Sequence, residues 1–252
     1  MRISELTLVT IMHKPSHDPL FIRKIYESQE TIEQSYLEKI AVISNVTDSQ
    51  VEKSLMDLDF KVFKIEKKGV AHARRSALKI AIEVSENTHF HYCDLDRLLT
   101  WATYHPSELI ALKESLFASN ADYIIIGRTD YAFDTHPTSW KKTEQVANSV
   151  FSTFCNFDVD ITAGSAGMSR DALQVINKHT NDSYSMTDAE WPLLVFQTDS
   201  LLGSIRVNGL RYDDNLNASC NRSSEIVEWE SRINLMNSVL EVVFVANKTK
   251  TH

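Results

Sequence analysis

The stretch HFHYCDLDR, residues 89–97, decides how the rest of the chain is interpreted. Its first residues are aromatic, histidine or cysteine, as in a buried strand, and we expect a strand over 89–96. Asp94 and Asp96 stand at its end with one leucine between them. Two carboxylates at this spacing can both reach one hard cation such as Mg²⁺ or Mn²⁺. An isolated pair of this kind also occurs in solvated loops, so the rest of the chain must decide.

The segments around this stretch alternate between strand and helix patterns. We expect strands over 6–12, 39–44, 60–66 and 121–129, and helices over 21–37, 51–58, 70–86, 105–117 and 138–154. Such alternation predicts an α/β fold with a mostly parallel sheet flanked by helices. Because ligands bind beyond the carboxyl ends of strands in such sheets, Asp94 and Asp96 are expected at a ligand site.

The pattern changes after residue 160. We expect a glycine-containing turn over 161–169, helices over 169–179 and 187–197, and a strand over 203–212. A long amphipathic helix is expected over 225–244, with one apolar face formed by Ile226, Trp229, Ile233, Met236, Leu240 and Val243.

Composition limits the possible classes of protein. A formal charge of −8 argues against a nucleic-acid-binding protein, which would carry a basic face. The three cysteines are far apart and form no C-x-x-C pair, which favours a reduced setting. The first residues do not resemble a secretory leader, and the longest apolar stretch, 239–246, is too short to span a bilayer. We therefore expect a cytoplasmic protein without a transmembrane segment.

Four stretches, in this order along the chain, resemble the glycosyltransferases of the GT-A fold, and in particular the large family 2. They are NVTDSQ (45–50), KGVAHARRSALKIA (68–81), YCDLDR (92–97), and GSAGMSRDAL (164–173) followed by TDAEWPLL (187–194). They resemble the family's turn after the second strand, its G-x-x-x-A-R-N helix, its DxD motif, and its acceptor-side glycine segment with an E-D acid motif. The sequence departs from the family at Asn45, Arg75 and Thr187, which leaves the donor and the acceptor chemistry open.

The resemblance covers about residues 5–212 and implies a GT-A type, Rossmann-like sheet in a single domain, 1–252. It implies a nucleotide-binding half over 1–130, an acceptor half over 131–212 and a C-terminal helical extension over 213–252. The implied activity is metal-dependent transfer of a sugar from a nucleotide-diphosphate-sugar donor to an unidentified hydroxyl acceptor. Asp94 and Asp96 would hold the divalent metal, Mn²⁺ or Mg²⁺.

The same resemblance suggests which residues serve the donor, the acceptor and the chemistry. Asp188 is the expected catalytic base, with Glu190 as the alternative, although an aspartate at a helix start also serves as a simple cap. Gly69 would let the chain turn into a helix whose N-terminus attracts an anion, and Arg74 would reach a phosphate. The expected donor-binding residues are Thr10, His13, Asn45, Asp48, Gly69, Arg74 and Asp94. The expected acceptor-side residues are Gly164, Gly167 and Trp191, whose ring could stack on a sugar.

Two other functions stay open at this stage. A nucleotidyltransferase of related architecture would need a glycine-rich loop after the first strand, and TIMHKPSHD (10–18) contains no glycine. A catalytically inactive protein that binds a nucleotide sugar would not need Asp94, Asp96 and Asp188. Metal-dependent hydrolysis of the donor would distinguish such a protein from an enzyme.

Overall fold

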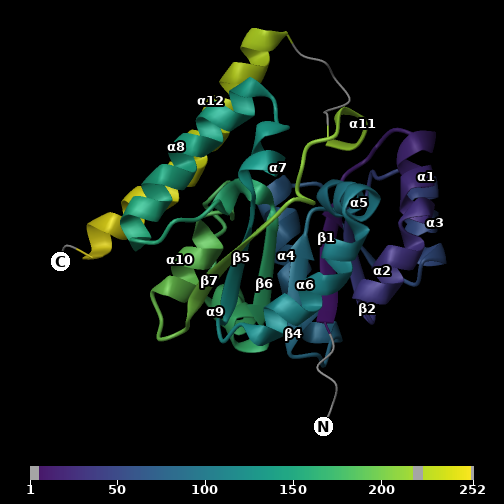
Figure 1. Ribbon diagram of the computed structural model, residues 1–252, viewed down its shortest axis with the longest axis horizontal. Helices are drawn as coiled ribbons and strands as arrows, with labels where there is room; N and C mark the ends of the chain where they lie inside the picture. Colours follow the sequence, from purple (N-terminus) through teal and green to yellow (C-terminus); the bar gives the residue numbers. More distant parts are fainter. Residues whose placement is uncertain (1–5, 218–223, 251–252) are drawn as a thin grey trace.

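The computed structural model describes residues 6–217 and 224–250, and its described residues form one seven-stranded sheet (Figure 1). The strands lie in the order β3-β2-β1-β4-β6-β5-β7, and β6 alone runs antiparallel to its neighbours β4 and β5. Their bounds are β1 (Leu6–Met12), β2 (Glu38–Ser44), β3 (Lys61–Ile65), β4 (His89–Cys93), β5 (Tyr123–Arg128), β6 (Ser165–Ser169) and β7 (Leu202–Val207). The expected mostly parallel α/β fold is confirmed.

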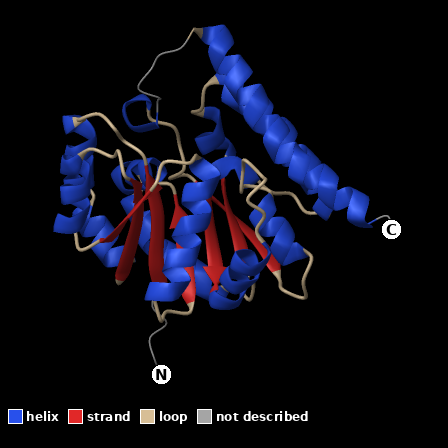
Figure 2. Ribbon diagram, turned by 180° about the vertical axis from the view of Figure 1, so that it is seen from behind, coloured by secondary structure: helices blue, strands red, loops and turns tan. Residues whose placement is uncertain are grey.

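Helices cover both faces of this sheet (Figure 2). One face packs against α1 (Pro19–Glu27), α2 (Gln29–Ser35), α3 (Ser49–Asp57), α5 (Leu95–Tyr104), α6 (Pro106–Ala118) and α11 (Asp214–Asn217). The other packs against α4 (Val70–Val84), α8 (Thr138–Cys155), α9 (Arg170–His179), α10 (Glu190–Phe196) and α12 (Glu225–Lys250). Along each strand alternate side chains enter the two cores: in β1, Leu8 enters one and Val9 the other. The short helices α7 (Asp130–Asp134) and η1 (Ile161–Ala163) follow β5 and precede β6.

Four expected elements differ from the structure, and one of them is the strand expected over 203–212, which ends at Val207. The single helix expected over 21–37 is two helices, because Ser28 ends α1 and begins α2. The strand expected to reach Asp96 ends at Cys93, and the next residues form α5, which buries Leu95, Leu98 and Leu99 at helical spacing. The turn expected over 161–169 contains the strand β6. This strand consists mostly of small residues because α6 packs closely on it: a Cβ atom on Gly167 would lie 2.7 Å from Leu116.

The C-terminal helix α12 packs along α8 (Figure 1). The apolar face predicted for this helix is confirmed in its C-terminal half, where Leu240 and Val243 are buried. The prediction is wrong near the N-terminus of α12, where Ile226 is 74 % exposed and Ile233 is also exposed. Parts of the expected extension, 218–223 and 251–252, lie outside the described residues. Within the described ranges, none of the helices combines the length and the apolar character needed to cross a bilayer.

The order of the strands determines where a ligand can bind. From β1, the chain builds the sheet outward through β2 and β3, and then returns to the opposite side of β1 with β4. Such a reversal leaves a crevice beyond the carboxyl ends of β1 and β4, which is where ligands of open α/β sheets bind. Gly164 lies at the same edge, because antiparallel pairing sets Ser165 opposite Cys93.

Candidate functional site

Asp94 lies at the carboxyl end of β4, directly before the first residue of α5. Its backbone N–H donates to the carbonyl of Gly164 at 3.2 Å, which fixes the end of β4 against the start of β6. Its side chain does not cap α5. Instead, Oδ2 accepts a hydrogen bond from Arg74 at 2.7 Å and Oδ1 accepts one from the hydroxyl of Tyr92. Gly164 has a φ of +73°, and a Cβ atom there would lie 2.9 Å from Asp94 Oδ2.

Arg74 joins two acidic residues that are far apart in the sequence. Its Nη2 lies 2.7 Å from Asp94 and its Nη1 lies 2.7 Å from Asp188. Its Nε also donates to Tyr92 at 3.1 Å. Burial alone would lower the pKa of Arg74, but the charges of Asp188 and Asp94 raise it well above its ordinary value. The guanidinium is therefore a fixed positive charge at the junction of the expected donor and acceptor halves.

Asp188 is held by Arg74 and not by the helix that follows it. The N-cap of α10 is Ala189, and no side chain caps this helix, so the interpretation of Asp188 as a simple cap is wrong. Its side chain is 7 % exposed. Burial raises the pKa of Asp188, Arg74 lowers it and Asp94 raises it again, with a net shift above the usual aspartate value. A carboxylate with a raised pKa is a stronger base, as proton abstraction requires.

Glu190, the alternative base, is fully engaged in the structure. Its side chain is 2 % exposed and lies 2.8 Å from Arg75. It also accepts hydrogen bonds from the hydroxyl of Thr180 at 3.0 Å and from the backbone N–H of Asn181 at 2.6 Å. Arg75, which the sequence could equally have placed on a solvated face, is buried in this ion pair. Together these contacts fix the segment 180–190 to α4.

Asp96 lies in the first turn of α5, beside Asp94. Its Oδ2 accepts a hydrogen bond from the side-chain amide of Asn217 at 2.9 Å. Burial raises the pKa of Asp96; Arg97 opposes this shift and the charge of Asp94 adds to it. A cation shared by Asp94 and Asp96 would offset both the burial of Asp96 and the repulsion between the two carboxylates.

A cavity of about 180 Å³ lies at the carboxyl ends of β1, β2 and β3 and at the start of α4. It is lined by Ile11, Met12, His13, Ser44, Ile65, Glu66, Lys67, Lys68, Gly69, Val70 and Ala73. Ala73 immediately precedes Arg74 in α4, so the first turns of this helix connect the cavity to the arginine that binds Asp94 and Asp188. His13 Nδ1 lies 2.8 Å from the hydroxyl of Ser44, and burial together with Lys67 lowers the pKa of His13. Gly69 precedes α4 with a φ of +99°, which favours glycine.

Three residues expected to bind the donor do not line this cavity. Asn45 is exposed and does not line the cavity, and Asp48 caps α3 by accepting from the backbone N–H of Gln50 at 2.9 Å. Thr10 is fully buried, and it precedes Ile11, which lines the cavity. Thr10 is not among the residues that line the cavity.

Two of the expected acceptor-side residues lie in the core. Gly167 lies within β6 and packs against Leu116. Trp191 is buried and its ring packs edge-on against Tyr92 at 5.2 Å, so it offers no open face to a sugar. Gly164, in contrast, lies directly against Asp94.

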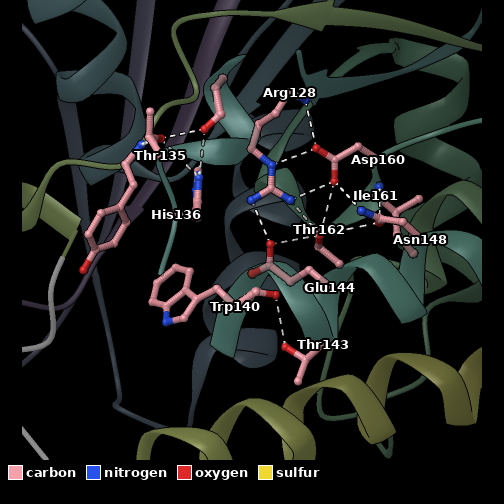
Figure 3. Close-up of polar contacts among 12 residues, drawn as sticks. Arg128, Thr135, His136, Trp140, Thr143, Glu144, Asn148, Asp160, Ile161 and Thr162 are labelled. Carbon is pink, nitrogen blue, oxygen red and sulfur yellow. Dashed lines mark hydrogen bonds and ion pairs between the residues drawn. The ribbon is translucent and has the colours of Figure 1, made fainter. Parts of the chain in front are cut away.

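Other polar residues of this region carried little signal in the sequence. Tyr92 and Asn217 contact the two aspartates, but nothing in the chain order predicts this. Arg128, at the end of the apolar strand β5, shows the same strand-then-charge pattern as Asp94. It is fully buried, with Nε 2.7 Å from Asp160 and Nη1 2.7 Å from Glu144 (Figure 3).

Comparison with known proteins gives structural matches only. No protein-family model matches the sequence, and no curated protein matches it. Glucosyl-3-phosphoglycerate synthase from Mycobacterium tuberculosis, in complex with Mg²⁺ and UDP, matches with a TM-score of 0.59 at 11 % identity, over 96 % of this chain and 79 % of that one. Mannosyl-3-phosphoglycerate synthase from Rubrobacter xylanophilus matches with a TM-score of 0.56 at 12 % identity, over 98 % and 75 %.

A synthetase complexed with CTP is also among the matches. CMP:2-keto-3-deoxy-manno-octonic acid synthetase, complexed with CTP, gives a TM-score of 0.51 at 11 % identity, over 81 % of this chain and 90 % of that one. At these identities the similarity concerns the fold. The chain has a divergent GT-A-like fold.

Proposed function

We propose that this protein is a metal-dependent glycosyltransferase that moves a sugar from a nucleoside-diphosphate sugar to a hydroxyl acceptor. The observation that carries the proposal is the position of Arg74, whose guanidinium binds both Asp94 and Asp188 beside the cavity. One group of residues thus offers a positive charge for a diphosphate (Arg74), a carboxylate for a cation (Asp94) and a second carboxylate that can act as a base (Asp188). Complexes of structural neighbours with Mg²⁺ and UDP support the same assignment.

The cavity would receive the nucleoside of the donor. His13 and Ser44 offer hydrogen-bonding groups at the ends of β1 and β2, and Ile11 and Ile65 offer an apolar surface. The diphosphate would then extend past the N-terminus of α4, where free N–H groups and Arg74 favour negative charge.

The two aspartates fit a divalent cation only as part of a larger set of ligands. Among the described residues, three or more acidic, histidine or cysteine side chains do not converge on one point. Mg²⁺ and Mn²⁺ are nevertheless commonly held by two carboxylates, with phosphate oxygens and water completing the coordination. Asp94 and Asp96 retain free lone pairs beside the hydrogen bonds that they accept. When bound, the cation would stabilise the charge that develops on the leaving diphosphate.

Asp188 would act as the base in an inverting transfer. Its carboxylate would accept the proton of the acceptor hydroxyl while the oxygen forms its bond to the sugar and the bond to the diphosphate breaks. Arg74 would keep Asp188 ionised and oriented. A retaining transfer would need no such base, and the turnover of Asp188→Asn distinguishes the two mechanisms.

The test is a thermal-shift series with UDP, GDP, CDP and ADP, each with and without Mn²⁺. We expect one nucleotide to stabilise the wild type, and Mn²⁺ to increase this stabilisation. Asp96→Asn should lose the increase, and the exposed Asp199→Asn should keep it. Nucleotide stabilisation that is the same with and without metal in the wild type would contradict the proposal.

The nucleotidyltransferase alternative rests on the match to the CTP-bound synthetase. Such an enzyme would release pyrophosphate from a nucleoside triphosphate and a sugar, whereas the proposed transferase releases a nucleoside diphosphate. A protein that binds the donor but releases neither product would be a binding protein without catalytic activity.

A further inference from the structure

A second group of charged and aromatic residues includes Arg97, which directly follows Asp96 in α5. We name it the Trp140 cluster; it consists of Arg97, His136, Trp140, Tyr212 and Arg232. The guanidinium carbon of Arg97 lies 5.4 Å from the centre of the Trp140 ring, and that of Arg232 lies 3.1 Å from it. Two positive side chains from α5 and α12 therefore share one indole ring.

These two arginines have few hydrogen-bond acceptors. Arg97 is 9 % exposed, and its single hydrogen bond within the described part of the chain goes to His136 Nε2 at 3.1 Å. Arg232, whose side chain is 19 % exposed, donates no hydrogen bond to any described residue. Its nearest carboxylate oxygen is Glu144 Oε1, at 3.9 Å.

The other buried arginines are satisfied by the protein itself. Arg74 and Arg128 each contact two carboxylates, and Arg75 contacts Glu190, Thr180 and the carbonyl of Tyr184. Buried N–H groups in folded proteins almost always have such partners. The remaining donors of Arg97 and Arg232 have no such partner among the described residues, and both guanidiniums lie against the Trp140 ring.

The acidic residues nearby are already engaged. Glu144 and Asp160 bind Arg128 (Figure 3), Glu228 accepts from the hydroxyl of Ser139 at 2.5 Å, and Asp96 accepts from Asn217. Burial lowers the pKa of Arg232 to about 10, and the charge of Arg97 contributes while Glu144 opposes. Positive charge at the Trp140 ring is therefore incompletely compensated.

His136 holds Arg97 in place and stays neutral. Its Nδ1 lies 3.1 Å from the carbonyl of Ala132, which only accepts, so Nδ1 carries the proton and Nε2 accepts from Arg97. Burial, with the charges of Arg128 and Arg97, lowers the pKa of His136 to about 2. The ring thus orients Arg97 without adding charge.

We propose that Arg97 and Arg232 form a binding site for an oxyanion, a phosphate or a carboxylate, carried by the acceptor. Arginine binds both groups through two parallel hydrogen bonds, for which these two side chains have free donors. Because Arg97 directly follows Asp96, the anion would lie beside the proposed metal pair, on the side of α7, α8 and α12. The assignment to the acceptor rests on the proposed function; the anion site itself does not.

The experiment titrates the nucleotide-free and metal-free protein with inorganic phosphate and, separately, with malonate, by isothermal titration calorimetry. We expect Arg97→Gln and Arg232→Gln each to weaken binding at least about tenfold. Arg23→Gln on α1, an exposed arginine paired with Glu27, is the matched control and should bind as the wild type does. Arg97→Lys keeps the charge without the paired donors, so it should bind less tightly than the wild type if it folds.

A second titration separates this site from the donor site. With saturating UDP and Mn²⁺ present, phosphate should still bind, because the nucleotide and the anion occupy different sites. Loss of nucleotide binding with phosphate binding intact would contradict the proposed function but not the anion site. Full displacement of phosphate by UDP, or equal phosphate affinity in the wild type and both glutamine variants, would overturn the anion site.

Discussion

Arg74 determines the protonation and the position of Asp188, two properties that a catalytic base needs. The raised pKa of Asp188 results from burial and from Asp94, and Arg74 limits that rise. A base with a pKa far below the working pH accepts a proton poorly, and one with a pKa far above it is already protonated. Burial of Asp188 therefore raises its pKa, and the fixed positive charge of Arg74 keeps that rise limited.

Asp188→Asn tests this role. The amide keeps the size of the side chain but cannot take the proton of the acceptor, so turnover should fall about 10²-fold or more. Affinity for the nucleotide and the metal should stay close to that of the wild type, because Asp94 and Asp96 are unchanged. Steady-state rates with the donor and acceptor, together with nucleotide titrations, measure both. Normal turnover would favour a retaining reaction without this base.

Glu190→Gln is the contrasting variant. Removing the charge leaves Arg75 buried without its counter-ion, which commonly costs about 3–5 kcal/mol of folding free energy. We therefore expect a lower unfolding midpoint in urea, with turnover of the folded protein little changed. A catalytic loss without a loss of stability would reverse the assignments of Asp188 and Glu190.

At the scale of elements, the sequence predicted the parallel strands and missed the antiparallel one. β1, β2, β4 and β5 are runs of apolar or aromatic residues bounded by polar turns, a pattern that is specific to buried strands. β6 reads SAGMS, and its small residues gain strand character only because β4 and β5 flank it and α6 packs on it. Such tertiary requirements cannot be derived from local sequence.

The same limit applies to the site. Asp94 and Asp96 could be proposed because they follow a recognisable strand, and Arg74 and Asp188 because they fall in motifs of the family that the sequence resembles. Asn45 and Asp48 were expected at the donor site, but they occupy a turn that the structure uses to begin α3. The Trp140 cluster could not be predicted, because its members come from four separate segments and share no motif.

Gly164→Ala tests how β6 supports the site. Glycine is needed there for two reasons: a φ of +73° strains an L-residue, and the new methyl group would lie 2.9 Å from Asp94 Oδ2. The backbone strain should cost about 1–2 kcal/mol, and Asp94 must also shift. We expect the Mn²⁺-dependent part of nucleotide binding to weaken about tenfold, or about 1.4 kcal/mol.

Gly167→Ala is the control on the same strand. Its methyl group would meet Leu116 at 2.7 Å and not the site, so this variant should lose thermal stability while the metal effect stays. Equal losses of the metal effect in both variants would mean that β6 acts through overall stability and not through Asp94.

At the scale of the whole molecule, two buried histidines link folding to pH. His91 lies between the hydroxyls of Tyr36, at 2.6 Å, and Ser165, at 2.8 Å, and burial lowers the pKa of His91 to about 3. The pKa of His136 is lowered to about 2, as described above. In the unfolded chain both return to a pKa of about 6.5.

The sign follows from proton counting. Below about pH 6.5 the unfolded chain binds a proton at each histidine and the folded protein does not, so stability falls as the pH falls. The contribution of His91 is complete above about pH 6.5 and is lost progressively down to about pH 3. Asp96 and Asp188, whose pKa values are raised, act in the opposite direction: they favour folding at low pH and lose that contribution as the pH rises.

His91→Gln isolates one histidine from these opposing groups, because it leaves both aspartates in place. For the wild type, each buried histidine should reduce the free energy of unfolding by about 2 kcal/mol between pH 7 and pH 5. The variant will differ in stability at both pH values, since glutamine cannot satisfy Tyr36 and Ser165 in the same geometry. The decisive quantity is therefore the drop between the two pH values, measured by urea unfolding, which should be about 2 kcal/mol smaller in the variant. Equal drops in the two proteins would mean that His91 is already protonated in the folded state at pH 5. Both ring nitrogens would then donate, and the hydroxyls of Tyr36 and Ser165 would both accept.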